Sequence, residues 1–280
     1  MKKIFILIIG IIALISADVY CMNIDTMMSV LEKSKDGIAS VFASIDKELS
    51  IAAKKLSGVD LKGEEARAIV GKLCKGRPYV IDCAIVDAAG KMLVVEPEEY
   101  RRYEGADIGK QTHIVALHQN KKPVLSDVFH SVEGVAIIDF GYPIFSDNGT
   151  FLGSVNMLVR QEALSRDIIM PFTEDMPCKA WIMQKDGLII FDPDPNQIGR
   201  NIFTDELFRS FGVLVSFSKT VTLAEDGAGS YDFYARGLED KTVVKKYAVW
   251  DTVSFYGTQW RIIVMETDKP ASAAAEKTTK

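Results

Sequence analysis

The feature that most constrains this chain is a segment that occurs twice. Residues 85–97 and 182–193 follow the same order: an apolar run, a turn containing glycine, a second apolar run, then an acidic residue and proline. Each copy continues into a polar loop with a small cluster, at 105–109 in the first and 197–201 in the second. A repeated hairpin and loop predicts two similar modules on one chain.

Length and composition agree with this division. The chain has 280 residues, which is enough for two domains of ordinary size. Its hydrophobic fraction of 48 % and charged fraction of 25 % are normal for a packed globular protein. The net charge of −5, with no basic run interleaved with aromatic residues, argues against nucleic acid as a partner.

The N-terminus has the pattern of an export signal. Two lysines precede an apolar stretch at 4–15, which Ser16 and Ala17 follow. The stretch is short for a membrane span, which needs about 20 apolar residues. Cleavage after Ala17 or after Cys21 is one interpretation, and an uncleaved N-terminal anchor is the other. Both predict that the body of the protein is exported, either periplasmic or extracellular.

A long amphipathic helix is expected next, over residues 24–57. Its apolar side chains recur at steps of three and four residues, which places them on one face. That face either packs along the chain's own modules or pairs with the same helix of a second copy, forming a homodimer. The stripe consists of Ile24, Met28, Leu31, Ile38, Phe42, Ile45, Leu49, Ala52 and Leu56.

The remaining pattern predicts an α+β fold with two antiparallel sheets. The hairpin at Asp147-Asn148-Gly149 carries the strongest turn signal. Strands are expected at 79–86, 91–95, 135–145, 150–159, 179–184, 188–191, 230–234, 245–254 and 258–266, and short helices at 112–119, 161–170 and 204–212.

These elements divide the chain into consecutive units. We expect a signal peptide or anchor at 1–22, N-terminal helices at 23–77, module one at 78–160, a linker helix at 161–177, module two at 178–267 and a disordered tail at 268–280.

The order of these segments resembles the double Cache family of PAS-like extracytoplasmic sensor domains. The resemblance extends from Ile24 to Thr267 and rests on the long helix together with residues 86–91, 122–129, 142–153, 186–195 and 258–264. It implies two tandem modules, of which the first, membrane-distal one binds a small ligand. The second usually lies beside the membrane and relays the signal to a kinase, cyclase or chemoreceptor output.

Two departures from the family pattern bear on function. Family members normally continue into a transmembrane helix, whereas this sequence ends in a polar tail, so we expect a free or anchored binding protein that works with a separate membrane receptor or kinase. Amino-acid-binding members carry an arginine and paired aromatic residues where this chain has residues 111–114. Their absence here argues against an α-amino acid and leaves an organic acid, an amine or a similar small molecule.

Asp139 is the most informative candidate ligand-binding residue. It interrupts the apolar run 135–140 in a strand that we expect to be mostly buried. A buried carboxylate needs a partner, which is a ligand amine, an internal arginine or solvent. Strand alternation puts Asp139 on one face with Ile137 and Gly141, and Gly141 is expected to leave room beside the carboxylate.

Other candidates surround this strand. His113 begins the expected helix at 112–119, where backbone N–H groups favour an anion, although an exposed cap residue is the alternative. The loop at 100–103 combines aromatic and cationic groups that suit a carboxylate, or else is simply solvated. The full candidate set is Asp139, His113, Tyr100, Arg101, Arg102, Tyr103, Tyr142, Asn156 and Asp127.

The sequence predicts no cofactor and no metal site. Asp192 and Asp194 alternate with prolines, which stiffen a turn more simply than they coordinate calcium. Cys74 and Cys83 flank a turn and either form a disulfide or remain buried thiols.

Three functions compete at this stage. The favoured one is a non-catalytic sensor or solute-binding protein, since nucleophile-elbow, HExxH and phosphate-loop motifs are missing. A structural or adaptor protein that dimerises through the long helix is the second, and it predicts a filled interior in module one. The third is an exported hydrolase that pairs His113 or His130 with Asp127 or Asp139.

Overall fold

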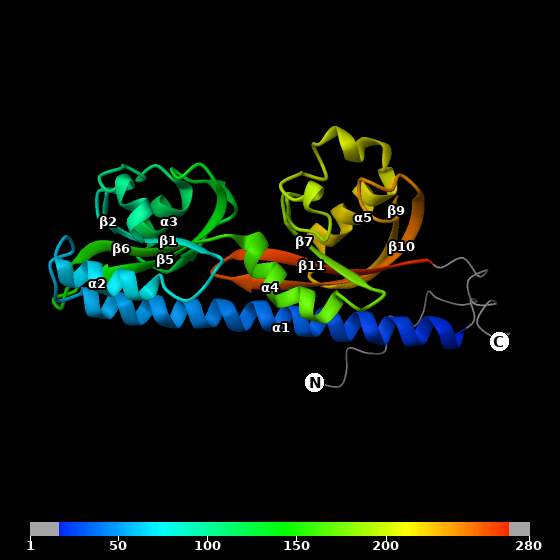
Figure 1. The fold of residues 1–280 in the computed structure, drawn as a ribbon, viewed down its shortest axis with the longest axis horizontal. Helices are drawn as coiled ribbons and strands as arrows, with labels where there is room; N and C mark the ends of the chain where they lie inside the picture. The colour runs from blue at the N-terminus through cyan, green and yellow to red at the C-terminus, as the bar shows by residue number, and fades with distance from the viewer. Residues whose placement is uncertain (1–16, 269–280) are drawn as a thin grey trace.

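The structure is a computed structural model that describes residues 17–268. Figure 1 shows one long helix, α1 (Ala17–Leu56), that runs beneath two modules placed side by side along it. The apolar stretch at 4–15 and the tail from 269 onward lie outside the described residues. In the part of the chain that the structure describes, we find no helix long and apolar enough to cross a membrane.

A second N-terminal helix, α2 (Glu64–Leu73), follows α1. The elements of module one are β1 (Val80–Asp87), β2 (Met92–Glu96), η1 (Glu98–Tyr103), α3 (Thr112–Asn120), β3 (Val124–Leu125), β4 (Phe129–His130), β5 (Ala136–Phe145) and β6 (Phe151–Val159). Its antiparallel sheet has the order β2-β1-β6-β5-β3, and β4 pairs with β5. Helix α1 packs on one face of this sheet, and α3 with its neighbouring loops covers the other (Figure 1).

Module two follows the linker helix α4 (Gln161–Thr173). Its elements are β7 (Lys179–Gln184), β8 (Ile189–Phe191), η2 (Pro195–Gln197), η3 (Glu206–Ser210), α5 (Gly212–Leu223), β9 (Gly227–Tyr234), β10 (Val243–Phe255) and β11 (Thr258–Thr267). The sheet order is β8-β7-β11-β10-β9. The α+β class, with a long helix followed by two antiparallel sheets, is therefore confirmed.

The repeated segments fold alike. Gly90 and Gly187 both adopt a φ of 90° at the turn of the first hairpin in their module. The loop cluster then returns to that hairpin through an isolated bridge, Lys91 to Asp107 in module one and Leu188 to Asn201 in module two. The sequence repeat thus marks two structurally equivalent units.

Helix α1 forms one continuous core with both sheets. Ile38, Phe42, Ile45 and Leu49 are almost completely buried in a cluster that includes residues from β5 and β11. One stripe residue was wrong: Met28 is 45 % exposed, and Met27 is buried in its place. The helix also begins earlier than residue 24, because it already starts at Ala17.

Two other expectations about helices were wrong. The short helix predicted at 204–212 is the 3₁₀ turn η3, and α5 follows it over Gly212–Leu223. This segment is rich in β-branched residues, yet burial of Leu214, Phe217 and Val221 against the sheet overrides that preference. The linker helix also continues through Pro171 rather than ending before it.

Candidate functional site

The candidate site lies on the face of the module-one sheet that is turned away from α1. Asp82 on β1 and Asp139 on β5 are both paired with Leu158 of the strand between them, so their backbones flank Leu158 from opposite sides. Asp82 is completely buried and Asp139 is 1 % exposed. The register of three strands therefore brings two carboxylates to one buried region.

A third carboxylate comes from the loop above the sheet. Glu133 lies between β4 and β5, and it lines a small cavity together with Asp139, His113, Asn156 and Phe129. The cavity has a volume of about 10 Å³, which is room for roughly one water molecule. Helix α3, the 129–135 loop and the sheet thus close tightly around this cluster.

Most of the carboxylate oxygens in this cluster lack a hydrogen-bond partner. Both oxygens of Asp82, both of Glu133 and Oδ1 of Asp139 are buried and unbonded. Buried polar groups in folded proteins are nearly always hydrogen-bonded, because desolvation without a bond is costly. The region therefore has unmet capacity to accept hydrogen bonds.

The other oxygen of Asp139 is held by two side chains. Asn156 Nδ2 donates to Asp139 Oδ2 at 2.5 Å, and Ser154 Oγ donates to Asn156 Oδ1 at 2.6 Å. His113 Nε2 lies 3.3 Å from the same Oδ2, and its ring packs against Phe129 at 4.4 Å between centroids. His113 is 8 % exposed, so it is buried rather than an exposed cap residue.

The surroundings of the Asp82 carboxyl disfavour its charged form. Burial raises the pKa of the Asp82 carboxyl well above its usual value, and the nearby Glu133 and Asp139 carboxylates raise it further. No cation within the described part of the chain forms an ion pair with Asp82. Among the described residues, no basic side chain therefore offsets the charge of an ionised Asp82, whereas Asp139 has His113 beside it.

The expectation that Gly141 leaves room beside Asp139 was wrong. A Cβ at Gly141 would lie 2.7 Å from Leu117 Cδ1 and 2.9 Å from Asn156 Nδ2. The space that glycine provides is already occupied by these two side chains. Gly141 thus allows Asn156 to approach Asp139, and the cavity itself lies elsewhere, beneath the 129–135 loop.

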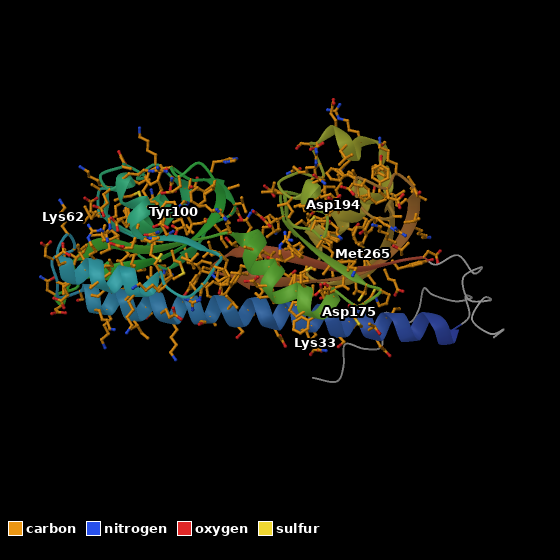
Figure 2. The ribbon with its side chains drawn as sticks, in the orientation of Figure 1. Lys33, Lys62, Tyr100, Asp175, Asp194 and Met265 are labelled. Carbon is orange, nitrogen blue, oxygen red and sulfur yellow. The ribbon has the colours of Figure 1, made fainter. Side chains whose placement is uncertain are left out.

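The structure brings only part of the predicted set together. Asp139, His113 and Asn156 meet at the cavity, and Tyr100 packs close by against the cluster of Ile81, Ile137 and Leu158. Figure 2 shows Tyr100 on the upper side of module one, away from α1.

The other predicted residues have different surroundings. Arg101 pairs with Glu96 at 2.8 Å, and Arg102 lies over the ring of Tyr103, 5.0 Å from its centroid. Tyr142 packs into the core on the α1 side of the sheet, and Asp127 is exposed near module two. None of these residues lines the cavity.

Asp82 and Glu133 were not among the predicted site residues. Asp82 had a usable signal, because it interrupts an apolar run at 80–86 just as Asp139 interrupts 135–140. Glu133 had none, since a glutamate in a polar loop is normally solvated.

The two cysteines that flank the turn at 76–78 do not form a disulfide. Cys74 and Cys83 are free thiols, and Cys74 Sγ donates to the Glu96 backbone carbonyl.

Comparisons with known proteins agree with this architecture. Residues 40–161 match the family described as HK/GC/chemotaxis protein-like, sensor domain. An extracellular ligand-binding receptor from Desulfohalobium retbaense DSM5692 is 28 % identical over 85 % of this chain, with a TM-score of 0.70. The chain has the fold of a Cache-type sensor domain.

More distant sensor domains share this fold over nearly their whole length. The ligand-binding domain of the Campylobacter jejuni chemoreceptor Tlp3, in complex with 4-methylisoleucine, is 11 % identical, with 95 % of this chain and 97 % of that one covered and a TM-score of 0.66. The domain of the Pseudomonas aeruginosa PAO1 amino acid chemoreceptor PctB, in complex with L-Arg, is 13 % identical, with coverages of 91 % and 98 % and a TM-score of 0.59.

This Cache-type chain spans 39 % of the length of the Desulfohalobium receptor chain that it matches. No curated protein matches the sequence. The relatives found are ligand-binding and signalling domains rather than enzymes.

Proposed function

We propose that this protein is an extracytoplasmic sensor domain that binds a small organic cation in module one. The observation that supports this ligand class is the group of buried carboxylate oxygens without hydrogen-bond partners on Asp82, Glu133 and Asp139. No lysine or arginine lines the cavity, so a cationic ligand would supply the missing charge. An ammonium group offers several N–H donors to such a cluster.

An organic cation fits better than a metal ion. Among the residues that the structure describes, no three histidine, cysteine, aspartate or glutamate side chains are arranged to hold a metal. An amine has hydrogen-bond donors at its end and an apolar body, and the cavity walls offer Ile108, Met92 and Leu158 beside the carboxylates.

Binding would require the 129–135 loop to move outward, because the closed cavity holds about 10 Å³. The short strand β4 holds this loop to β5 through only two paired positions. A cation bound between Glu133 on the loop and Asp139 on the sheet would favour one loop position over the other. In this proposal, the change in loop position transmits ligand binding to a membrane receptor or kinase, or to helix α1 of a second copy.

The hydrolase alternative also has one supporting observation. His113 and Asp139 form the His–carboxylate pair that such an enzyme would need, at 3.3 Å. However, Glu133 lines the same cavity as Asp139 and Asp82 lies near both, and the matching family is one of sensor domains. We therefore assign the pair to ligand recognition.

Isothermal titration with a panel of small amines, paired with neutral alcohols of the same shape, tests the proposal. We expect at least one amine to bind and its alcohol counterpart not to bind. Asp139→Asn and Glu133→Gln should each weaken that affinity tenfold or more, since each removes a charge-assisted hydrogen bond. Asp127→Asn is the matched control, because Asp127 is exposed and outside the cavity.

Two results would count against this function. Tight binding of anions at module one would contradict the acidic site. An absence of any amine binding, together with concentration-dependent self-association, would favour the adaptor role instead.

A further inference from the structure

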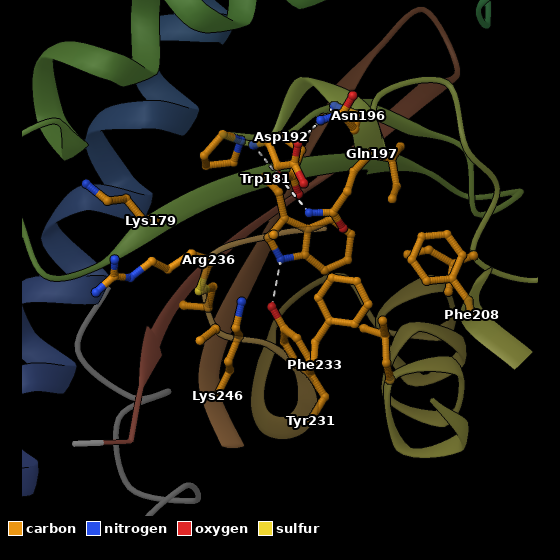
Figure 3. A pocket seen from close by; sticks show the side chains of 18 of the residues that line it. Lys179, Trp181, Asp192, Asn196, Gln197, Phe208, Tyr231, Phe233, Arg236 and Lys246 are labelled. Carbon is orange, nitrogen blue, oxygen red and sulfur yellow. Dashed lines mark hydrogen bonds between the residues drawn. The ribbon is translucent and has the colours of Figure 1, made fainter. Parts of the chain in front are cut away.

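Module two contains a second and much larger cavity, which the module-one proposal does not use. It has a volume of about 430 Å³ and lies between one face of the sheet and the loops that follow β8 and β9 (Figure 3). Small-molecule sites in proteins typically occupy about 300–1,000 Å³. This cavity is therefore open to a ligand without rearrangement, unlike the closed one in module one.

The sheet register builds the floor of this cavity. Lys246 on β10 is paired directly with Tyr231 on β9, so both side chains project from the same face. Trp181 of β7 lies on that face as well, and Figure 3 shows all three side chains converging. Lys246 lies on the same face of β10 as Ala248 and Trp250, whose side chains belong to the hydrophobic core between the module-two sheet and its loops. The sequence therefore places a lysine at an inward-facing position.

Lys246 is a buried lysine that forms no direct ion pair in the described part of the chain, and the Asp192 carboxyl, which also lines the cavity, lies near enough to interact with its charge. The residue is 4 % exposed, and within the described chain no carboxylate lies within 4.0 Å of its Nζ. The Lys246 Nζ lies over the ring of Phe233, 5.6 Å from the ring centroid. Burial lowers the pKa of Lys246, and the nearby Asp192 carboxyl opposes this shift only in part. An anion in direct contact with the ammonium group would stabilise its charged form further.

A second donor lies beside the ammonium group. The Tyr231 hydroxyl accepts a hydrogen bond from Trp181 Nε1 at 3.2 Å, which leaves its own hydrogen available. Tyr231 is 3 % exposed and lines the cavity. An ammonium and a hydroxyl on paired strands can together hold the two oxygens of one carboxylate.

The carboxyl of Asp192 does not exclude an anion from this cavity. Its Oδ1 accepts hydrogen bonds from the Asp194 backbone N–H at 2.8 Å and from Gln197 Nε2 at 3.1 Å. Burial raises the pKa of Asp192 to about 7, so much of it is uncharged near neutral pH. The rim carries both signs, on Arg236 and Glu239, so selection by charge depends on the interior Lys246.

We infer that the module-two cavity is a second ligand site, which takes a small organic carboxylate with an aromatic or aliphatic body. The carboxylate contacts Lys246 and Tyr231. The apolar body packs against Trp181, Phe208 and Phe233, which give the cavity an aromatic wall. This site stands independently of the amine site in module one.

Calorimetry with the purified protein tests the site with benzoate, phenylacetate and hexanoate as probes. Benzamide and benzylamine serve as the neutral and cationic counterparts of benzoate. We expect at least one of the three carboxylates to bind. If benzoate binds, benzamide and benzylamine should bind at least tenfold more weakly.

The decisive variants differ by one position in the sequence. Lys246→Met keeps the length of the side chain and removes the charge, and it should weaken carboxylate binding at least tenfold. Lys245→Met is the matched control, because Lys245 is exposed on the opposite face of the same strand. Tyr231→Phe, which removes only the hydroxyl, should weaken binding by a smaller factor, and thermal unfolding verifies that each variant is folded.

The inference is overturned if none of the three carboxylates binds at millimolar concentration or if Lys246→Met binds them as the unaltered protein does. It is also overturned if benzoate binds and benzamide binds equally tightly. Asp139→Asn separates the two sites, since it should leave carboxylate binding unchanged while it reduces amine binding. Failure at one module therefore does not imply failure at the other.

Discussion

At the scale of single residues, Asp82 illustrates how a buried carboxyl group can reduce stability. Its carboxyl is completely buried and has no hydrogen-bond partner. Because its pKa is raised in the folded state, the folded protein retains this proton at pH values where the unfolded chain loses it. The contribution of Asp82 to stability is thus complete below the unfolded pKa of about 3.9 and is lost as pH rises through the folded pKa.

We therefore expect Asp82→Asn to flatten the pH dependence of stability. Between pH 5 and pH 8 the unaltered protein should lose at least about 1 kcal/mol more unfolding free energy than the variant, as a shift of one pKa unit corresponds to about 1.4 kcal/mol. Urea denaturation at the two pH values measures this difference. Asp36→Asn, at an exposed position on α1, is the control, and an Asp82→Asn slope equal to that of the unaltered protein would contradict the account.

At the scale of elements, the repeated hairpin turn is a contact point as well as a turn. Gly90 has a φ of 90°, and a Cβ placed there would lie 2.2 Å from Gly109 Cα and 2.6 Å from Gly109 N. The obstacle is backbone, which cannot rotate away as a side chain can. The turn therefore holds the 105–109 loop against the hairpin, and that loop leads directly into α3 with His113.

Gly90→Ala should consequently destabilise module one more than an ordinary turn substitution does. Gly149→Ala is the matched control, since Gly149 has a φ of 82° but nothing within 4 Å of its Cβ position. The control should lose about 1 kcal/mol from backbone strain alone, and Gly90→Ala at least about 1 kcal/mol more from the steric clash. Chemical denaturation compares them, and equal losses would show that the loop yields without cost.

At the scale of the whole molecule, α1 joins the two modules into one packed unit. The ring of Phe42 contacts Phe140 of module one at 5.2 Å and Trp260 of module two at 5.0 Å between centroids. Lys35 adds an ion pair to Asp251 at 2.7 Å, although its partly exposed position gives it little energetic weight. Shared burial along α1 thus links the two modules physically.

Phe42→Ala should therefore weaken both modules together. We expect a loss of about 3–5 kcal/mol in unfolding free energy, whereas Ile51→Ala, at a site that is 47 % exposed on the same helix, should lose under about 1 kcal/mol. All three tryptophans, at 181, 250 and 260, lie in module two, so fluorescence reports that module and circular dichroism reports both. If the fluorescence and circular dichroism curves coincide in the unaltered protein and in both variants, the two modules unfold as one cooperative unit. Loss of one module before the other would contradict this.

The sequence by itself determined those features that depend only on residues close together along the chain. The doubled hairpin, the stripe of α1 and the turn at Asp147-Asn148-Gly149 follow from local periodicity and turn chemistry, and they predicted the α+β fold with two sheets. The same reasoning failed for α5, where tertiary burial overrides a composition that is typical of strands.

The candidate sites were decided by the tertiary structure. Asp82 is far from Glu133 and Asp139 in the sequence, and only the pairing of β1 and β5 with β6 brings it near Asp139. The fold of the 129–135 loop then places Glu133 with Asp139 at the small cavity. Likewise, the register of β9 with β10 sets Lys246 beside Tyr231 beneath an open cavity. A local pattern can show that a charged residue interrupts an apolar strand, but strand register and loop packing determine which groups that residue meets.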